Sequence, residues 1–368
     1  MSRAARAVID CDALRHNLQR AAAVNPHARQ YPVIKADAYG HGLLPVAQAL
    51  AEQADGFAVA SIDEALLLRE AGVENPILLL EGFFHADELA DIQQFSLDIV
   101  VHHVGQLQAL EDLSRQQDIS KAITVWLKVD TGMHRLGFAV DEAASAWQRL
   151  TRCSAVAQPP RLMTHLACAD DLHNPASQRQ IELFNSVLPQ AHTERSIANS
   201  AGILGWLASH ADMDRPGIML YGVSPFLGET GEQRRLRPVM TLRSELIAIK
   251  HCARGNAVGY GGTWVCPEAM PVGVVAMGYG DGYPRHAPTG TPVLVNGVET
   301  PLIGRVSMDM LCVDLRGQPE AKVGDEVVLW GEGLPAETVA RAADTIAYEL
   351  FCNVAARVPR EYVKESIE

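Results

Sequence analysis

The stretch YPVIKADAYGHG, residues 31–42, places Lys35 at the end of an apolar run, with small, aromatic and glycine residues after it. A lysine in this position often only closes a strand, because its long stem lets the ammonium group reach water. A lysine that is desolvated near other cations becomes a nucleophile instead, because its pKa falls from about 10.4 towards neutrality. Lys35 is therefore a candidate to react with a carbonyl group at the mouth of a pocket.

Short apolar runs alternate with helix-like segments between about residues 31 and 215. This alternation predicts an α/β fold in which parallel strands close into a (β/α)8 barrel of the TIM type. The expected strands are YPVIK, GFAVA, PILLL, LDIVV, AITVWLKV, RLMTH, ERSIA and DMDR. In one intervening helix, Ser61 and Glu64 have the spacing of a capping box.

The carboxyl ends of barrel strands lie on one face, and that face carries the active site. The positions found there are Lys35, with Tyr39 beyond it; the segment LKVDTGMHRLG; His165; Asn199 and Ser200; and Arg215, followed by Gly217 and Ile218. Lysine, arginine, hydroxyl and backbone N–H donors together suit a phosphorylated aldehyde, and pyridoxal 5′-phosphate (PLP) is such an aldehyde. The phosphate need not belong to a nucleotide, because no Walker or Rossmann glycine pattern is present.

The pattern of apolar and polar residues changes in the polar stretch at residues 225–240. From about Arg237 onward, short apolar runs are separated by glycine and proline, and Asn296-Gly297 predicts a β-hairpin. We expect a barrel domain at residues 1–236 and a mostly β domain at 237–368, barrel-like or closed, with one helical segment near 335–345. The opening residues 1–11 could form a strand that pairs with the second domain.

Composition excludes several classes of protein. The formal net charge of −13 over 368 residues argues against nucleic-acid binding, although a local arginine cluster still permits a small anionic substrate. The seven cysteines are scattered and form no C-x-x-C pair, which favours reduced thiols in the cytoplasm and no metal centre. Neither a signal peptide nor an apolar run of about 18 residues is evident, so we expect no membrane span.

Ordered motifs over essentially the whole chain resemble those of the alanine racemase family. They are VIKADAYGHG, LKVDTGMHRLG, IANSAG, RPGIMLYG, VGYGGTW, AMGYGDGYPR, GRVSMDM and a terminal AYEL. The resemblance implies a barrel followed by a β domain, PLP as the cofactor and a homodimer with shared active sites. The implied activity is interconversion of L- and D-alanine, either to supply D-alanine for peptidoglycan or to run alanine catabolism.

The resemblance also implies roles for single residues. Lys35 matches the PLP-attachment lysine and one acid/base, and Tyr260 matches the second acid/base, supplied by the partner subunit on the opposite face of the cofactor. Two bases on two faces explain racemisation, because a proton removed from one side returns on the other. A tyrosine needs positive charge or hydrogen bonds nearby for this task, because its ordinary pKa is about 10.

Other matches concern cofactor and substrate. The phosphate-holding set is Tyr39, Ser200 and Tyr348 with the backbone of Gly217 and Ile218, and Asn199 orders their loop. Arg215 matches the arginine that faces the pyridine nitrogen, which makes the ring a weaker electron sink than a carboxylate partner would, and His165 lies beside it. Arg135 matches a contact to the cofactor's phenolic oxygen and the substrate carboxylate. The partner's side of the site is implied for Met308 and Asp309, and the entrance for Tyr279 and Arg285.

Some readings stay open at this point. Lys128 matches a lysine that is carbamylated in some members, and pairing with a carboxylate is equally compatible with the sequence. Asp37 stands where the family more often has asparagine, which leaves the charge around Lys35 open. Alternatives in the same fold are a racemase of serine or a larger amino acid, a decarboxylase, which Arg215 argues against, and a non-catalytic PLP-holding protein, which the β domain argues against.

Overall fold

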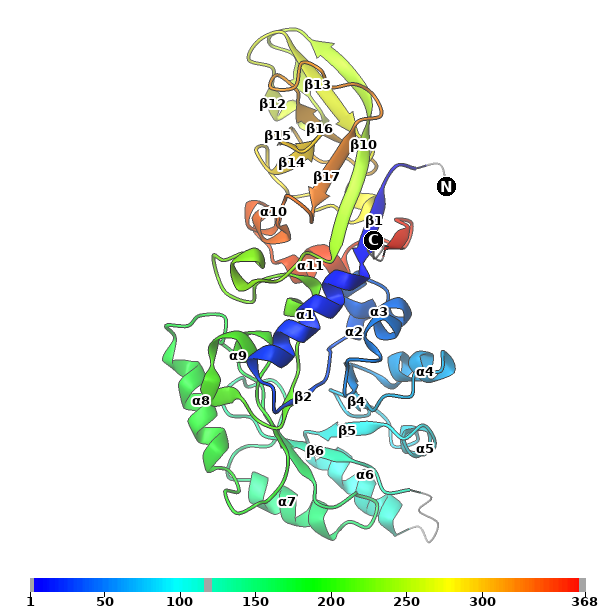
Figure 1. Cartoon of the computed structure of the whole chain (residues 1–368), viewed down its shortest axis with the longest axis vertical. Helices are drawn as coiled ribbons and strands as arrows, with labels where there is room; N and C mark the ends of the chain where they lie inside the picture. The colour runs from blue at the N-terminus through cyan, green and yellow to red at the C-terminus, as the bar shows by residue number, and fades with distance from the viewer. Residues whose placement is uncertain (1–2, 116–120, 364–368) are drawn as a thin grey trace.

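The structure, a computed structural model, describes residues 3–115 and 121–363. Figure 1 shows an elongated chain in which a barrel ringed by helices forms one half and a β-rich domain the other. The barrel strands are β2 (Arg29–Gln30), β3 (Phe57–Val59), β4 (Ile77–Leu79), β5 (Asp98–Val101), β6 (Val125–Lys128), β7 (Arg161–Met163), β8 (Arg195–Ser196) and β9 (Met213–Asp214). All eight fall in or next to the predicted runs.

The eight strands close into a ring. Strands β3 to β8 form one parallel sheet in sequence order, and β2 pairs in parallel with β9. Isolated parallel bridges from Val33 to Ala58 and from Asn199 to Arg215 join the two sheets. The predicted (β/α)8 barrel is confirmed. One detail differs, because the first run pairs regularly only at residues 29–30, and Lys35 begins a helical turn rather than ending a strand.

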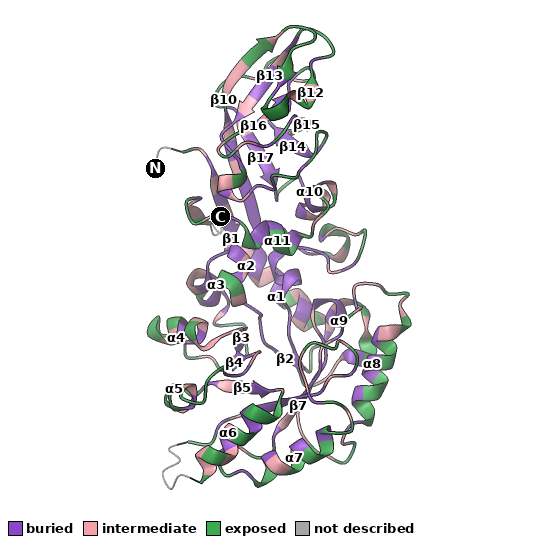
Figure 2. Cartoon of the chain, turned by 180° about the vertical axis from the view of Figure 1, so that it is seen from behind, coloured by how far each residue is buried: buried purple, intermediate pink, exposed green. Residues whose placement is uncertain are grey.

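Helices cover the outside of the barrel. They are α1 (Cys11–Val24), α3 (Leu43–Leu50), α4 (Ile62–Glu70), α5 (Glu88–Gln94), α6 (Val104–Ser114), α7 (Ala143–Arg152), α8 (Pro175–Ser186) and α9 (Ser200–Gly205). Their inner faces are buried and their outer faces exposed, as Figure 2 shows. The short turn α2 (Lys35–Gly40) lies instead at a cavity, which its residues Lys35 and Tyr39 line. On each strand, alternate residues face the helices and the barrel interior. Val125 and Leu127 belong to the helix-facing core, whereas Trp126 belongs to the interior layer.

The second domain is a closed β structure with two short helices. Its strands are β10 (Met240–Cys252), β11 (Ala257–Val258), β12 (Trp264–Val265), β13 (Met270–Val275), β14 (Pro292–Val295), β15 (Val298–Ile303), β16 (Leu311–Asp314) and β17 (Glu326–Trp330), with α10 (Ala336–Ala342) and α11 (Ala347–Cys352) after them. The order β13-β16-β15-β14-β17-β10 closes because β10 also pairs with β13. The predicted hairpin is confirmed, since Asn296 and Gly297 take positive φ between β14 and β15.

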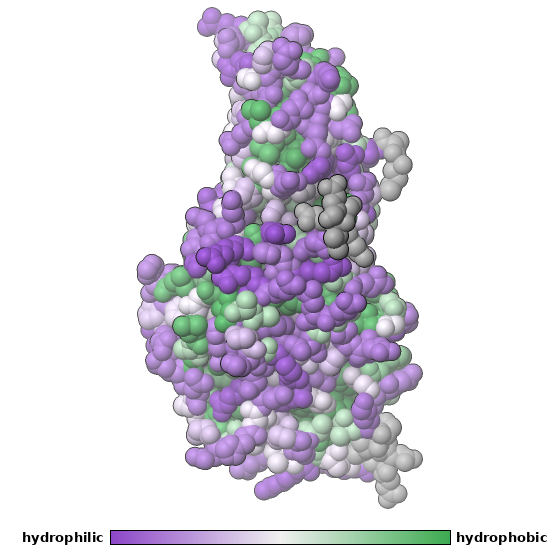
Figure 3. Space-filling view, in the orientation of Figure 1, coloured by the Kyte–Doolittle hydropathy of each residue, from purple (hydrophilic) through white to green (hydrophobic). Residues whose placement is uncertain are grey.

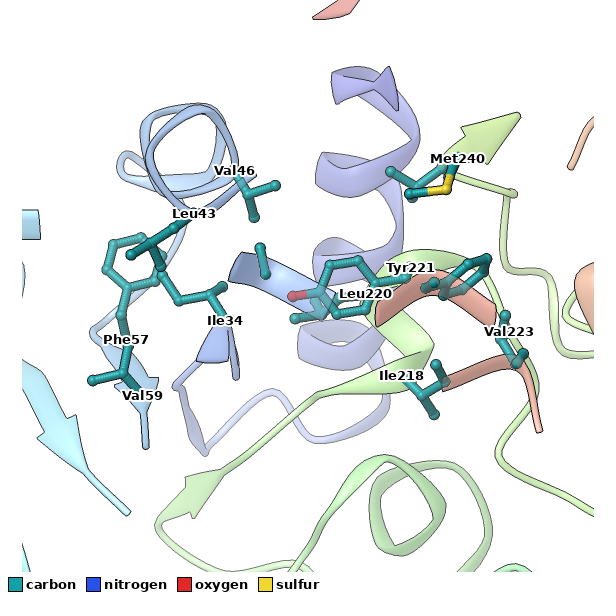
Figure 4. Close-up of a cluster of buried hydrophobic side chains, with 14 of the residues drawn as sticks. Ile34, Leu43, Val46, Phe57, Val59, Ile218, Leu220, Tyr221, Val223 and Met240 are labelled. Carbon is teal, nitrogen blue, oxygen red and sulfur yellow. The ribbon is translucent and has the colours of Figure 1, made fainter. Parts of the chain in front are cut away.

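The two ends of the chain meet in the second domain's sheet. Strand β1 (Arg6–Asp10) lies between β10, which it pairs with in antiparallel fashion, and β18 (Arg360–Val363), which runs parallel to it. One continuous apolar core crosses the junction between the domains. Figure 4 shows Ile34 from the barrel on one side of Tyr221 and Met240, the first residue of β10, on the other. The residue before Lys35 is therefore fixed in this core.

The face of the molecule seen in the orientation of Figure 1 is predominantly polar. The face in Figure 3 is mostly hydrophilic, with separate hydrophobic patches rather than one apolar band. Within residues 3–115 and 121–363, no helix is long and apolar enough to cross a bilayer.

Candidate active site

The barrel's twofold side-chain alternation sets the positions of the candidate residues. Val33, Trp126, Met163 and Met213 fill the barrel interior. Two residues further along each strand direction stand Lys35, Lys128, His165 and Arg215, and all four line one cavity of about 1020 Å³. Because residues i and i+2 of a strand face the same side, Lys128, His165 and Arg215 form the next layer above the apolar interior, and Lys35 joins them from the turn after the first strand. The alternation therefore accounts for their meeting at the carboxyl ends of the strands.

Arg215 is fixed by hydrogen bonds to neutral oxygen atoms, two backbone carbonyls and one hydroxyl, rather than by a carboxylate. Its Nη2 donates to the Thr164 carbonyl at 2.7 Å and the Ile197 carbonyl at 3.2 Å, and its Nη1 donates to the Ser196 hydroxyl. Its Nε–H makes no hydrogen bond to any described residue and so remains available to a ligand. Burial lowers the pKa of Arg215 to about 10, so the group remains charged at neutral pH.

The floor of the cavity carries an excess of positive charge. Burial, together with the charges of Arg215, Arg135 and Lys35, lowers the pKa of Lys128 to about 8. Burial and the same neighbouring cations lower the pKa of His165, so its imidazole is neutral, and its Nδ1 lies 3.4 Å from Nη2 of Arg215. The carboxylate of Glu81 acts on Lys128 in the opposite sense but more weakly than these cations, so positive charge predominates. The floor of the cavity therefore suits a negatively charged ligand.

Hydroxyl and amide groups converge on another wall. Ser200 Oγ accepts hydrogen bonds from the backbone N–H of Gly217 at 2.9 Å and of Met219 at 3.3 Å. A Cβ placed on Gly217 would lie 3.0 Å from the Tyr39 hydroxyl and 3.8 Å from Ser200 Oγ. The missing side chain thus leaves a small cradle lined by two hydroxyls and the backbone. The two hydroxyls can donate hydrogen bonds to an anionic group such as a phosphate.

The backbone of the Lys35 turn, residues 35–40, has an unusual conformation. Ala36, Asp37, Ala38 and Tyr39 all lie in the left-handed helical region, with φ between 52° and 54°. Each non-glycine residue in this region costs roughly 1–2 kcal/mol, so the turn stores strain. Glu64 accepts from the Ala36 N–H at 2.7 Å and the Ala60 N–H at 2.8 Å. The expected capping box is wrong, because Glu64 binds this turn and Ser61 makes no capping hydrogen bond.

Aromatic rings support the cradle. The Tyr39 ring stacks on Tyr221 at 4.8 Å between centroids and lies 5.9 Å from Tyr348. Burial raises the pKa of Tyr39 well above its ordinary value and that of Tyr348 to about 12. Both phenols are therefore protonated donors at neutral pH.

The cavity collects most, but not all, of the residues expected from the sequence. Its lining includes Lys35, Tyr39, Lys128, Arg135, His165, Asn199, Ser200, Arg215, Gly217, Ile218 and Tyr348. Tyr260, Met308 and Asp309 do not line it. Tyr279 and Arg285 line a separate, smaller hollow of about 300 Å³. Tyr260 is 68% exposed and Met308 53% exposed on the β domain.

Several supporting residues were not expected from the sequence. Thr164 and Ser196 hold Arg215, and Asp130 organises the loop before Arg135. Asp130 Oδ1 accepts from the N–H groups of residues 132, 133 and 134 at 2.9–3.1 Å. An aspartate soon after a strand, with a glycine two residues later, is the available sequence signal for such a loop.

The fold and cavity define an enzyme that holds a small anionic ligand beside an amine. Family models of the alanine racemase N-terminal and C-terminal domains match residues 9–225 and 239–362. An alanine racemase from Halorhodospira halophila is 53% identical over 99% of each chain. The chain belongs to the alanine racemase family, which confirms the resemblance found in the motifs.

Solved structures agree with this assignment. The biosynthetic alanine racemase from Pseudomonas aeruginosa superposes with a TM-score of 0.94, at 46% identity over 98% of this chain and 99% of that one. An alanine racemase from Bartonella henselae, described with covalently bound pyridoxal phosphate, superposes with a TM-score of 0.89 at 29% identity, over 98% of this chain and 99% of that one.

Proposed function

We propose that this chain is a PLP-dependent isomerase that interconverts L-alanine and D-alanine and thereby supplies D-alanine. The observation that carries the proposal is the cavity itself. It places the Lys35 amine, a predominantly cationic floor and a cradle with two hydroxyl donors around one space, in a chain of the alanine racemase family. When bound, PLP withdraws electrons from the α-carbon of an attached amino acid and so makes its α-proton acidic.

The residues present fit PLP part by part. Tyr39, Ser200 and Tyr348 offer hydroxyls for the phosphate, with the backbone of Gly217 and Ile218, while Asn199 accepts the Gly202 N–H at 3.0 Å and fixes their loop. Arg215 would donate its Nε–H to the ring nitrogen, with His165 beside it. Arg135 offers a cation to the phenolic oxygen and to the carboxylate of the amino acid. Lys35 supplies the amine for attachment.

Two residues of this chain move protons in the proposed reaction. Lys35 removes or returns the α-proton on one face of the substrate, and Tyr260 does so on the other. Arg215 stays protonated and donates without giving up its proton, because its pKa remains about 10. An arginine partner in place of a carboxylate limits electron withdrawal by the cofactor ring and so disfavours reactions beyond proton exchange.

We propose a homodimer because Tyr260 does not line the cavity of its own chain. Tyr260 lies in a short 3₁₀ turn, Tyr260–Gly262, at the tip of the β11–β12 hairpin, where a second copy could insert it into the partner's cavity. Met308 and Asp309 would accompany it near the substrate, with Tyr279 and Arg285 at the entrance. Lys128 would support Arg135 as a carbamate, because its ammonium form is a cation that repels the Arg135 guanidinium.

Further assignments belong to the same proposal. The cysteines are odd in number and scattered along the sequence, which favours a cytoplasmic enzyme. We place the domain boundary between residues 236 and 237, in line with the gap between the two family models and the start of β10 at Met240. The outer limits of the two domains include residues 1–2 and 364–368, which lie outside the described residues.

The test is chirality-resolved analysis of products from the purified, PLP-loaded enzyme. L-alanine, L-serine and L-lysine are supplied separately, with Tyr260→Phe as the control. Rapid formation of D-alanine that collapses in the control supports a two-base alanine racemase. Stronger turnover of serine or lysine would overturn the substrate, and bound PLP without racemisation of any of them would overturn the activity.

A further inference from the structure

The end of the Lys35 turn is held from the opposite end of the chain. The Tyr362 hydroxyl donates to the His41 carbonyl at 3.1 Å, and Arg360 Nε donates to the Gly40 carbonyl at 3.2 Å. Both residues belong to β18, which pairs with β1 in the sheet of the second domain. The sheet of the second domain is therefore connected directly to the turn that begins at Lys35.

Arg360 uses its other donors on one neighbouring segment. Its Nη1 donates to the carbonyls of Ala355 and Val358, each at 3.0 Å, and its Nη2 donates to the Val354 carbonyl at 2.8 Å. The guanidinium thereby ties the segment after α11 to Gly40. The fit is close, since a Cβ on Gly40 would lie 2.2 Å from the Phe351 carbonyl oxygen.

His41 holds the same turn from within. Its Nδ1 lies 3.1 Å from the Ala38 carbonyl oxygen and 3.0 Å from that of Tyr39. Because carbonyls only accept, Nδ1 carries the hydrogen, and burial lowers the pKa of His41 to about 3, which keeps the ring neutral. The ring packs against Tyr221 and Phe351, and its buried Nε2 has no partner among the described residues.

We propose that His41, Arg360 and Tyr362 form a clamp that positions the strained Lys35 turn, and with it the Lys35 amine and the Tyr39 hydroxyl. None of the three lines the cavity, whereas Lys35 and Tyr39 both do. The clamp therefore acts through those two residues, as a set of positioning residues. Its consequence for catalysis rests on the proposed function, because only a PLP-binding site needs that amine and hydroxyl in register.

Tyr362→Phe is the mildest test, because it removes one hydroxyl and keeps the ring. Its matched control is Glu361→Gln, on the other face of the same strand, where Glu361 lies 4.0 Å from Arg6. In the PLP-loaded enzyme we expect amide hydrogen exchange at residues 36–43 to quicken about fivefold in Tyr362→Phe, the effect of losing one typical hydrogen bond. We expect kcat to fall by a similar factor, the KM for alanine to stay within about twofold, and Glu361→Gln to match the wild type.

A second pair of variants separates the hydrogen bond of His41 from its packing. His41→Asn keeps an N–H close to the position of Nδ1, whereas His41→Leu removes it. We expect Leu to accelerate exchange and lower kcat more than Asn does, so that the amide partly rescues the turn.

The clamp is overturned if both Tyr362→Phe and His41→Leu leave exchange at residues 36–43 unchanged in folded enzyme. It is also overturned if they raise the KM alone. Exchange is measured independently of turnover, so a wild-type enzyme that fails to racemise alanine would overturn the proposed function while the exchange comparison still decides the clamp.

Discussion

The two domains differ in how completely a single chain builds its share of the site. In the barrel, Arg215 is 3% exposed and Lys128 8% exposed, and each is surrounded by neighbours that fix or perturb it. On the β domain, Tyr260 is 68% exposed and Met308 53% exposed. The candidate residues of the barrel are therefore buried in a formed cavity, whereas those of the β domain are exposed to solvent. In the proposed homodimer, cofactor binding would be a property of one chain and proton transfer a property of two.

The largest expected loss of activity comes from a substitution in the barrel domain. Lys35→Ala removes both the attachment amine and one acid/base, so we expect activity to fall by at least about 10⁴-fold. Racemisation assays and the absorbance of bound PLP measure the two losses separately. Lys250→Ala, at an exposed lysine of β10, is the control and should behave as wild type. Substantial racemisation by Lys35→Ala would mean that another amine does its work.

Tyr260→Phe tests the exposed half. We expect a loss of about 10²–10⁴-fold, typical of removing one general acid/base, with PLP affinity unchanged. In D₂O, the variant should exchange the α-proton of one alanine enantiomer only, because the remaining base reaches one face. NMR of both enantiomers measures this exchange. Equal exchange from both enantiomers would contradict the assignment of Lys35 and Tyr260 to opposite faces of the substrate.

The cationic floor predicts a pH dependence of stability. The pKa of Lys128 is lowered from 10.5 to about 8, mainly by burial and then by Arg215, so the charged lysine opposes folding below pH 8. Between about pH 8 and 10.5, the unfolded chain holds a proton that the folded chain has released, so the free energy of unfolding rises with pH. Relative to Lys128→Met, the wild type should gain about 3 kcal/mol across this window.

Urea unfolding of the wild type and Lys128→Met at several pH values measures that difference. A constant difference between pH 7 and 10.5 would show that an anion, such as a carbamate, already compensates the floor.

The smallest effect is expected at the cradle. Ser200→Ala removes one hydroxyl beside Gly217, so we expect PLP to bind about tenfold more weakly with little change in kcat at saturating PLP. Equilibrium titration with PLP measures the affinity. Ser186→Ala, near the exposed end of α8, is a matched control. An unchanged affinity for Ser200→Ala would place the phosphate elsewhere.

The sequence predicted the barrel and the strand-end residues of the cavity because both depend on local periodicity, whereas Tyr348 was matched only through the family resemblance. Strand alternation carries Lys128, His165 and Arg215 to one face, whatever the details of the loops. It could not predict the left-handed Lys35 turn, because four non-glycine residues with positive φ contradict local propensity and persist only through tertiary contacts. Arg360 and Tyr362, about 320 residues away, left no local signal for their contacts with that turn.

The most direct test of the division between the domains is a pair of mixed dimers isolated with two affinity tags. A dimer of one Lys35→Ala chain and one Tyr260→Phe chain contains one intact site if the sites are shared, so we expect about half of wild-type activity. A dimer of one wild-type chain and one chain with both substitutions contains no intact site and should be nearly inactive. The reverse result, an inactive first dimer and a half-active second one, would show that each chain completes its own site and would contradict the account.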